Sequence, residues 1–349
     1  MCFMARPKSR NAAGKNYMMV RGANRAIPDS LLKLLIKQKY HIAGEHSAAK
    51  LCHWAGEVLR GGEGCYKNRF YGIASHRCLQ CTPVLLFCNH ACVFCWRVMP
   101  EKSLSFKDMP GKRFEWDEPG KIAEWLLAEQ RKIVSGFGGN PKVRRRLYDE
   151  ALKPMHAALS LTGEPAMYPH LERLIGEFHG RGMTTFLVTN GTFPERISKW
   201  KTFPTQFYVS MVAPNEGIYR TAIRPKSMGL WKKYLRTLEL LPGIGKKTRT
   251  VLRMTIARGV NDSDLDGYAA QINIAQPHYV EVKSMVFVGG ARMDGRGLHP
   301  GSMLEIDEIE AAAAKLAQKT GYVVSDHHVP SRVVLLSRNE KAEGARFIA

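Results

Sequence analysis

Short apolar runs, several of them rich in β-branched residues, alternate with amphipathic stretches along most of this 349-residue chain. The apolar runs predict β-strands at residues 84–87, 157–161, 185–189, 207–212, 250–257 and 280–288. Helical spacing of apolar residues predicts helices at 119–134, 168–181, 228–241 and 306–320. About six such units predict an α/β fold, a parallel βα barrel that need not close, with its chemistry at the C-terminal ends of the strands.

The two ends of the chain lack this regular alternation. Residues 1–27 have the pattern of a loose basic arm, and Asp29 with Ser30 resembles the cap of a short helix over residues 31–40. We therefore expect three parts. These are an N-terminal extension at 1–82 that packs on the barrel, a barrel core at 83–290 and a C-terminal covering segment at 291–349.

Composition restricts the class of protein. With 45% hydrophobic residues the chain can bury a large core. No apolar run approaches the ~20 residues that a membrane helix needs, and the first 30 residues lack the apolar core of a signal peptide. We expect a cytoplasmic protein that does not bind membranes, whose eight cysteines are reduced thiols or metal ligands.

Charge indicates the kind of partner. The formal net charge is +21, spread over the whole chain, and a field of that sign favours a polyanion such as nucleic acid. A solvated basic surface is the alternative interpretation. Candidate phosphate contacts are Lys142, Arg144, Arg145, Arg146, Lys232, Lys233, Lys246, Lys247 and Arg249. Residues 241–248 resemble the hairpin of a helix-hairpin-helix element, but the strand predicted at 250–257 favours a simple turn.

Three closely spaced cysteines follow the first predicted strand, in the sequence CNHACVFCW. Thiolates of Cys88, Cys92 and Cys95 can hold three irons of a cubane and leave the fourth iron without a protein ligand. One alternative is a zinc site to which His90 contributes, and another is a disulfide with one spare thiol. Zinc loops favour C-x2-C pairs over C-x3-C-x2-C, so we prefer the iron–sulfur interpretation.

A second set of cysteines lies upstream at equal spacing, C-x12-C-x12-C. It consists of Cys52, Cys65 and Cys78. Long equal spacers do not specify a metal, so two alternatives to a cluster remain open. The thiols could simply be buried apolar groups, or a zinc site could be built from Cys78, Cys81 and histidines such as His53 and His76.

The C-x3-C-x2-C loop, with Phe94 before its third cysteine, resembles the radical S-adenosylmethionine (SAM) superfamily. That resemblance implies a 4Fe-4S cluster, SAM as cofactor and an open barrel of the radical SAM type. It also implies SAM contacts at the strand ends, where Glu164 would bind the methionine ammonium group and Gly163 would permit close approach. Further candidates of this kind are Thr162, Thr189, Asn190 and Ser210. Val212 stands where relatives usually carry an acidic residue.

Both cysteine sets together, with GCYKNRFYGIASHRC between them, resemble the wyosine-forming radical enzymes that act on transfer RNA, the 4-demethylwyosine synthases. The resemblance extends from about residue 52 to residue 336. It implies that Cys52, Cys65 and Cys78 hold a second 4Fe-4S cluster and that Lys67 forms a Schiff base with pyruvate, the co-substrate. Cys81 is surplus to the family's trio and leaves open whether it closes the second site.

The resemblance also implies a reaction, that of a carbon–carbon lyase. A 5′-deoxyadenosyl radical would attack the N-methyl group of N1-methylguanosine at position 37 of tRNA(Phe), and condensation with pyruvate would give the tricyclic base 4-demethylwyosine. No flavodoxin-like domain precedes the cysteines, as in the short archaeal form, so we expect a separate flavodoxin- or ferredoxin-like electron donor, and a monomer. Alternatives are another radical SAM enzyme that modifies RNA by methylthio or methyl transfer, or a non-catalytic zinc protein that binds RNA.

Overall fold

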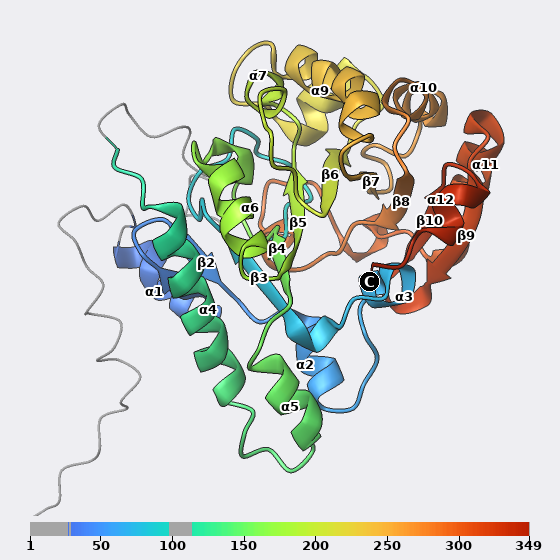
Figure 1. Ribbon diagram of the computed structural model, residues 1–349. Helices are drawn as coiled ribbons and strands as arrows, with labels where there is room; N and C mark the ends of the chain where they lie inside the picture. Colours follow the sequence, from blue (N-terminus) through green and yellow to red (C-terminus); the bar gives the residue numbers. More distant parts are fainter. Residues whose placement is uncertain (1–26, 28, 98–113, 349) are drawn as a thin grey trace, which may run out of the picture.

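The computed structural model describes residues 27, 29–97 and 114–348, and its centre is one ten-stranded sheet (Figure 1). Six neighbouring strands are parallel and follow chain order: β3 (Cys78–Thr82), β4 (His156–Leu159), β5 (Thr184–Thr189), β6 (Gln206–Met211), β7 (Arg249–Ile256) and β8 (Tyr279–Ser284). The prediction of a parallel βα barrel is confirmed.

Antiparallel strands extend the sheet on both sides. The hairpin of β1 (His41–Ala43) and β2 (Ser47–Ala49) pairs with β3. At the other side β10 (Val333–Ser337) pairs with β8 and with β9 (Val323–His328). The two edge strands, β1 and β9, do not pair with each other, so the barrel is open as predicted.

Helices cover the outer face of the sheet (Figure 1). In chain order they are α4 (Pro119–Ser135), α5 (Arg145–Ala151), α6 (Leu171–His179), α7 (Pro194–Ile197), α9 (Leu230–Ile244), α10 (Leu265–Ala275) and α11 (Ile306–Thr320). Helix α10 has no counterpart among the predicted helices. Smaller elements are α1 (Asp29–Lys37), α2 (His53–Leu59), α3 (Tyr66–Tyr71), α8 (Glu216–Ile218) and α12 (Glu340–Gly344). No helix of the described residues is long and apolar enough to cross a membrane.

Alternation along the strands separates two clusters of the core. Leu187 on β5 and Phe207 on β6 face outward and join the large cluster under the helices. Phe186 and Tyr208, their neighbours in sequence, face the barrel interior and form a second cluster with Phe70 of α3. The interior is therefore partly filled by residues of α3.

The prediction of a first strand at residues 84–87 is wrong. The strand is β3, six residues earlier, and residues 84–87 form a buried turn in which Leu85 N donates to the His46 carbonyl at 2.7 Å. These residues are apolar because they lie in the core, not because they belong to a strand. Since β3 is the first parallel strand, the sheet is continuous across the proposed boundary at residue 82.

Near the end of α9 the chain does not form the hairpin that residues 241–248 resemble. The helix continues through Pro242 to Ile244, and β7 begins at Arg249. The strand argument against a helix-hairpin-helix element is confirmed, whereas the turn begins later than predicted. The basic arm predicted at residues 1–27 lies outside the described residues except for Ile27, which is buried.

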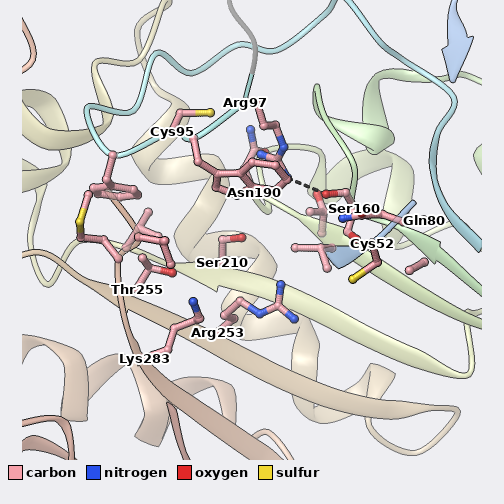
Figure 2. Close-up of a pocket in the computed structure, with 18 of the residues that line it drawn as sticks. Cys52, Gln80, Cys95, Arg97, Ser160, Asn190, Ser210, Arg253, Thr255 and Lys283 are labelled. Carbon is pink, nitrogen blue, oxygen red and sulfur yellow. Dashed lines mark hydrogen bonds between the residues drawn. The ribbon is translucent and has the colours of Figure 1, made fainter. Parts of the chain in front are cut away.

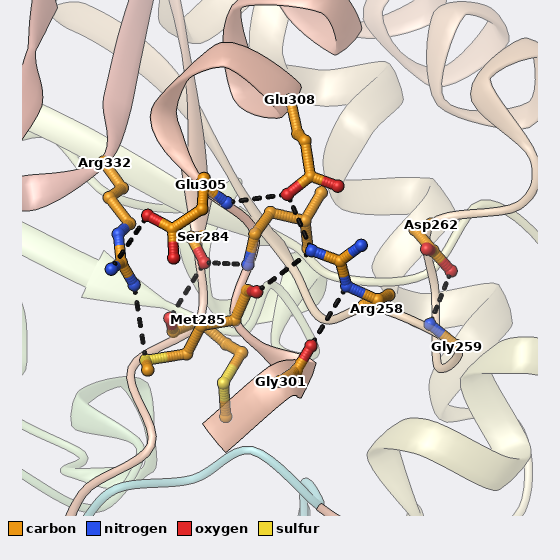
Figure 3. A network of polar contacts seen from close by, with 11 residues as sticks. Arg258, Gly259, Asp262, Ser284, Met285, Gly301, Glu305, Glu308 and Arg332 are labelled. Atoms are coloured by element: carbon orange, nitrogen blue, oxygen red, sulfur yellow. Dashed lines mark hydrogen bonds and ion pairs between the residues drawn. The ribbon is translucent and has the colours of Figure 1, made fainter. Parts of the chain in front are cut away.

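The segment before α11 is tied to the end of β7 by Arg258 (Figure 3). The Arg258 guanidinium donates to the Gly301 carbonyl at 3.0 Å and pairs with Glu308 at 2.7 Å. Glu308 also accepts from Glu305 N at 2.8 Å, which closes a capping box at the start of α11. Arg332 pairs with Glu305 at 3.0 Å, so the C-terminal addition is fastened to the barrel at several points.

Candidate active site

A cavity of about 380 Å³ occupies the barrel interior, and all six cysteines of the two predicted sets line it. Figure 2 shows Cys52 and Cys95 on opposite sides of this space, with Ser210 and Lys283 between and below them. Cys78 begins β3, whereas Cys88 follows the end of that strand. The cavity therefore extends from the N-terminal ends of the strands to their C-terminal ends.

The loop with Cys88, Cys92 and Cys95 is held by backbone hydrogen bonds to the segment after β6. Val93 N donates to the Ala222 carbonyl at 2.9 Å. Arg97 then fastens the loop to the end of β4, because its guanidinium donates to the carbonyls of Ser160 and Leu161, both at 2.8 Å. The loop conformation is thus fixed by protein contacts that leave the three thiols facing the cavity.

The segment after β8 covers the back of this loop. Gly289 and Gly290 lie against its backbone so closely that a Cβ at Gly289 would stand 2.1 Å from the Trp96 carbonyl oxygen. Gly289 also has a φ of +54°, which favours glycine. Buried Arg296 donates to the carbonyls of Cys92 and Val93. The chain therefore shields the cysteine loop with residues some two hundred positions further on.

Glu164 is the carboxylate among the candidates, and its charge acts on Cys88 of the cysteine loop. Its Oε1 accepts from Thr189 Oγ1 at 2.5 Å and from Ala166 N at 3.0 Å, and its Oε2 accepts from Asn190 N at 2.7 Å. Burial raises the pKa of this carboxyl in spite of these hydrogen bonds. A buried carboxylate with a fixed orientation can accept hydrogen bonds from an ammonium group, which would also favour its charged form.

The other predicted SAM contacts differ in how they meet the cavity. Asn190 and Ser210 line it. The Thr189 hydroxyl is directed to Glu164, so this residue orients the carboxylate. Thr162 is buried outside the lining, and its carbonyl accepts from Thr82. Val212 presents an apolar side chain to the cavity, so the acidic group usual at this position is absent.

The upstream cysteines occupy the starts of three elements. Cys52 caps α2, Cys65 caps α3 and Cys78 begins β3. The Cys65 thiol accepts from Ser75 Oγ at 3.2 Å, and Cys65 N donates to the same oxygen at 3.0 Å. Each of the three cysteines stands at the start of its element, and all three side chains line the same cavity.

Lys67 points into the barrel from α3. Its Nζ lies 5.0 Å from the ring centre of Phe186 and 4.6 Å from that of Tyr208. Burial, followed by the Arg253 guanidinium, lowers the pKa of this amine, while Glu281 and the thiols oppose the shift. A lysine with a lowered pKa carries more of the neutral amine that nucleophilic addition requires.

Cys81 does not belong to the upstream site. Side chains alternate along β3, so Cys78 and Gln80 face the cavity while Leu79 and Cys81 face the core under the helices. Cys81 is fully buried there. Among the cysteines that the structure describes, the trio therefore has no fourth cysteine ligand, as an open iron site would require.

The histidines considered for zinc are engaged elsewhere. His53 is largely exposed and lies beside Glu57. His76 pairs with Glu150 at 2.7 Å, and His90 hydrogen-bonds Tyr219 at 2.6 Å through its Nε2. Within residues 27, 29–97 and 114–348, no three His, Cys, Asp or Glu side chains are arranged around a single metal ion. The geometry disfavours both zinc alternatives.

Three thiols that line a cavity are also the donors that a cubane cluster uses. In a cubane each thiolate binds a different iron, so the three sulfurs stand further apart than around one ion. Burial raises the pKa of Cys92 well above its ordinary value, and burial with the Glu164 charge raises the pKa of Cys88 to about 12. Burial also raises the pKa of Cys78. Thiolates form in such a place only when a metal displaces the proton.

Sequence reasoning missed a charged network on the cavity floor. Arg253 of β7 pairs with fully buried Glu281 of β8 at 3.0 Å and donates to Tyr66 Oη at 2.6 Å. Tyr71 donates to the other oxygen of Glu281 at 2.9 Å. Lys283 lines the same floor. Arginine, glutamate and lysine at alternate positions of apolar strands were the signal that could have revealed it.

An open parallel barrel with a C-x3-C-x2-C loop after its first strand defines a radical SAM protein, and the model of the radical SAM superfamily matches residues 82–272. A second model, wyosine base formation, matches residues 274–338. The chain belongs to the family of S-adenosyl-L-methionine-dependent tRNA 4-demethylwyosine synthases.

Individual relatives agree with this assignment. The chain is 44% identical over 322 residues to the tRNA 4-demethylwyosine synthase of Pyrococcus horikoshii, with 91% of each chain covered. Identity to the synthase of Methanocaldococcus jannaschii is 38% over 316 residues, covering 90% of this chain and 98% of the relative. A structure of TYW1 with a lysine-pyruvate adduct bound matches with a TM-score of 0.78 and 38% identity, covering 92% of this chain and 98% of that chain.

Proposed function

We propose that this chain joins N1-methylguanosine at position 37 of tRNA(Phe) to carbons of pyruvate and forms 4-demethylwyosine, as a carbon–carbon lyase. The observation that carries the proposal is a single cavity lined by both cysteine trios and by Lys67. A similar protein has been seen with a lysine-pyruvate adduct, and Lys67 is a buried lysine suited to form one.

Each cysteine trio would hold one 4Fe-4S cluster, on Cys88, Cys92 and Cys95 and on Cys52, Cys65 and Cys78. When bound, the first cluster and SAM would supply the radical chemistry that makes a 5′-deoxyadenosyl radical. Glu164 would bind the SAM ammonium group, and Gly163 beside it lines the same space. Asn190 and Ser210 line the same space and offer polar groups to the ribose.

Lys67 would bind pyruvate covalently. Its neutral amine adds to the carbonyl carbon, water leaves, and the resulting Schiff base keeps the pyruvate methyl and carboxylate inside the cavity. The rings of Phe186 and Tyr208 stabilise a positive charge at this nitrogen, whether it is carried by the ammonium or by the iminium group.

The remaining partners follow from the reaction. The target base has to leave the anticodon stack to reach a barrel interior, while basic side chains hold the phosphates. We further propose a monomeric, cytoplasmic enzyme that receives electrons from a separate flavodoxin- or ferredoxin-like donor.

The test compares Lys67→Ala with Lys246→Ala, an exposed lysine after α9. Both proteins, prepared anaerobically with full iron content, are assayed for 4-demethylwyosine in tRNA and for 5′-deoxyadenosine. We expect Lys67→Ala to lose the tricyclic product by at least about a hundredfold while it still forms 5′-deoxyadenosine, because covalent catalysis is lost but the radical site is intact. Normal product formation by Lys67→Ala would contradict the Schiff-base role, and turnover without pyruvate would indicate a different RNA modification.

The two-cluster part of the proposal has its own measurement. Iron and sulfide should each fall by about half in Cys52→Ala relative to the unaltered chain, because one of two four-iron clusters is lost. Cys81→Ala is the matched control, since that thiol faces the core, and it should keep its full iron content.

A further inference from the structure

Two lysines in the cavity lack a carboxylate partner. Lys67 Nζ lies over two aromatic rings, and Lys283 Nζ donates to the Ser284 carbonyl at 3.2 Å. Glu281 acts on both amines through its charge, but neither forms an ion pair with an acidic side chain that the structure describes. A buried ammonium group without a counter-charge is costly. Such a pair of cations favours an anionic ligand in the space between them.

Strand register places Lys283 on the cavity floor. Arg253 pairs with Glu281 across β7 and β8, and Thr255 pairs with Lys283 two residues further on, so all four side chains face the interior. Figure 2 shows Lys283 and Arg253 side by side below Ser210, both directed into the cavity. Lys283 is therefore held at a fixed height by a strand, without dependence on a loop.

Arg253 is already neutralised, and Lys283 is not. The Arg253 guanidinium is occupied by the buried Glu281 carboxylate and by Tyr66. Burial, and then the Arg253 charge, lower the pKa of Lys283 to about 8. An anion beside Lys283 would restore its proton and remove the cost of burying the charge.

Lys67 and Lys283 both lie near the same arginine. Lys67 Nζ and the Arg253 guanidinium carbon are each 4.6 Å from the Tyr208 ring centre, and strand register puts Lys283 diagonally across from Arg253 on the same face of the sheet. A small molecule bonded to Lys67 can thus extend toward Lys283 within one cavity.

We propose that Lys283 binds the carboxylate of a 2-oxo acid whose carbonyl carbon is held by Lys67, and that it selects 2-oxo acids over neutral ketones. This inference rests on the proposed function, because it takes Lys67 as the site of the Schiff base. Lys283 is a binding residue for the co-substrate, and it adds a second point of attachment that fixes the direction of the pyruvate methyl group.

Reductive trapping tests the inference without turnover. Lys67 attacks the carbonyl carbon, water leaves, and cyanoborohydride delivers hydride to that carbon while the nitrogen takes a proton, so the adduct becomes a stable secondary amine that mass spectrometry locates. Trapping is titrated with pyruvate and with pyruvamide, its neutral analogue, on protein with both clusters assembled and iron content measured.

The compared proteins are the unaltered chain, Lys283→Met, Lys283→Arg and Lys246→Met as an exposed control. In Lys283→Met we expect the half-saturating pyruvate concentration to rise at least about tenfold, the value of one charge-assisted hydrogen bond. Pyruvamide trapping and iron content should not change, Lys283→Arg should recover most of the loss, and Lys246→Met should behave like the unaltered chain.

Other outcomes contradict the inference in recognisable ways. Equal pyruvate titrations in Lys283→Met and the unaltered chain would overturn it and place the carboxylate elsewhere, for instance at the open iron of the second cluster. An equal loss for pyruvate and pyruvamide would show that Lys283 only supports the fold. If the unaltered chain trapped no pyruvate on Lys67, the proposed function itself would fail.

Discussion

No side chain fits at Gly163. A Cβ there would lie 1.9 Å from the Val84 carbonyl oxygen and 2.8 Å from that of Phe87, in a backbone with a φ of +69°. Both carbonyls belong to the buried turn that leads into the cysteine loop. Gly163 therefore sets how closely the end of β4 approaches the residues that position Cys88.

The first prediction concerns this contact. We expect Gly163→Ala to lower the free energy of unfolding by at least about 3 kcal/mol, because left-handed strain adds to a backbone clash that neither carbonyl can relieve. Gly182→Ala is the matched control, since Gly182 has a φ of +71° and a Cβ added there would have nothing within 4 Å. It should cost about 1 kcal/mol in urea unfolding, and equal costs for the two variants would refute the steric argument.

At the level of single residues, sequence motifs identified the residues that lie close together in the chain. They missed the residues that only the pairing of strands brings together. The six cysteines and Lys67, which sequence spacing and resemblance singled out, all line one cavity. Arg253 and Lys283 went unnoticed because they are 30 residues apart in unrelated sequence, and only strand register brings them together. Thr162 was predicted from its neighbours, yet its side chain lies outside the cavity lining.

How well a strand could be predicted from the sequence depends on what its two faces contact: solvent, core or cavity. Strands β4 to β8 are buried on both faces and are recognisable as apolar runs. Strand β3 turns Cys78 and Gln80 toward the cavity, so its sequence CLQCT lacks that signature. We predicted a strand at the apolar turn that follows β3, instead of at β3 itself. Helix α11, with a capping box and a polar outer face, was predicted with its observed bounds.

Arg258 connects elements that are otherwise separate, and a second prediction follows from it. In Arg258→Met we expect the amides of residues 301–305 to exchange hydrogen about fivefold faster, because roughly 1 kcal/mol of local contacts is lost. Leu304 N, which donates to Ser284 Oγ at 2.8 Å, is the amide to follow. Arg173→Met removes one exposed ion pair, with Glu118, and should leave this segment unchanged. Uniform acceleration across the chain would instead indicate global destabilisation.

For the whole molecule, the net charge of +21 gives no information about where RNA binds. Two pairs of lysines at opposite ends of α9 allow two positions on the surface to be compared. The helix runs antiparallel to the strands, so exposed Lys232 and Lys233 lie near the cysteine loop, whereas exposed Lys246 and Lys247 lie at the opposite end of the barrel. Because the reactive base must enter at the end that holds the cysteine loop, we expect RNA phosphates near the first pair only.

The third prediction uses the two pairs as matched variants. Replacing Lys232 and Lys233 with Gln should reduce the slope of log Kd for tRNA against log salt concentration by about one to two, as expected for the loss of up to two phosphate contacts. Replacing Lys246 and Lys247 with Gln removes the same charge and should change the slope by less than about 0.5. Equal effects of both replacements would show that net charge alone drives binding.

The contact of Arg296 with the carbonyls of Cys92 and Val93 has a consequence for biosynthesis. A ribosome that has just added Cys92 must add 204 further residues before this arginine exists. Gly289 and Gly290, which cover the back of the same loop, are added only a few residues before Arg296. A nascent chain therefore presents the cysteine loop uncovered until residue 296 has been synthesised, and an iron–sulfur centre shielded by these contacts can form only after that point.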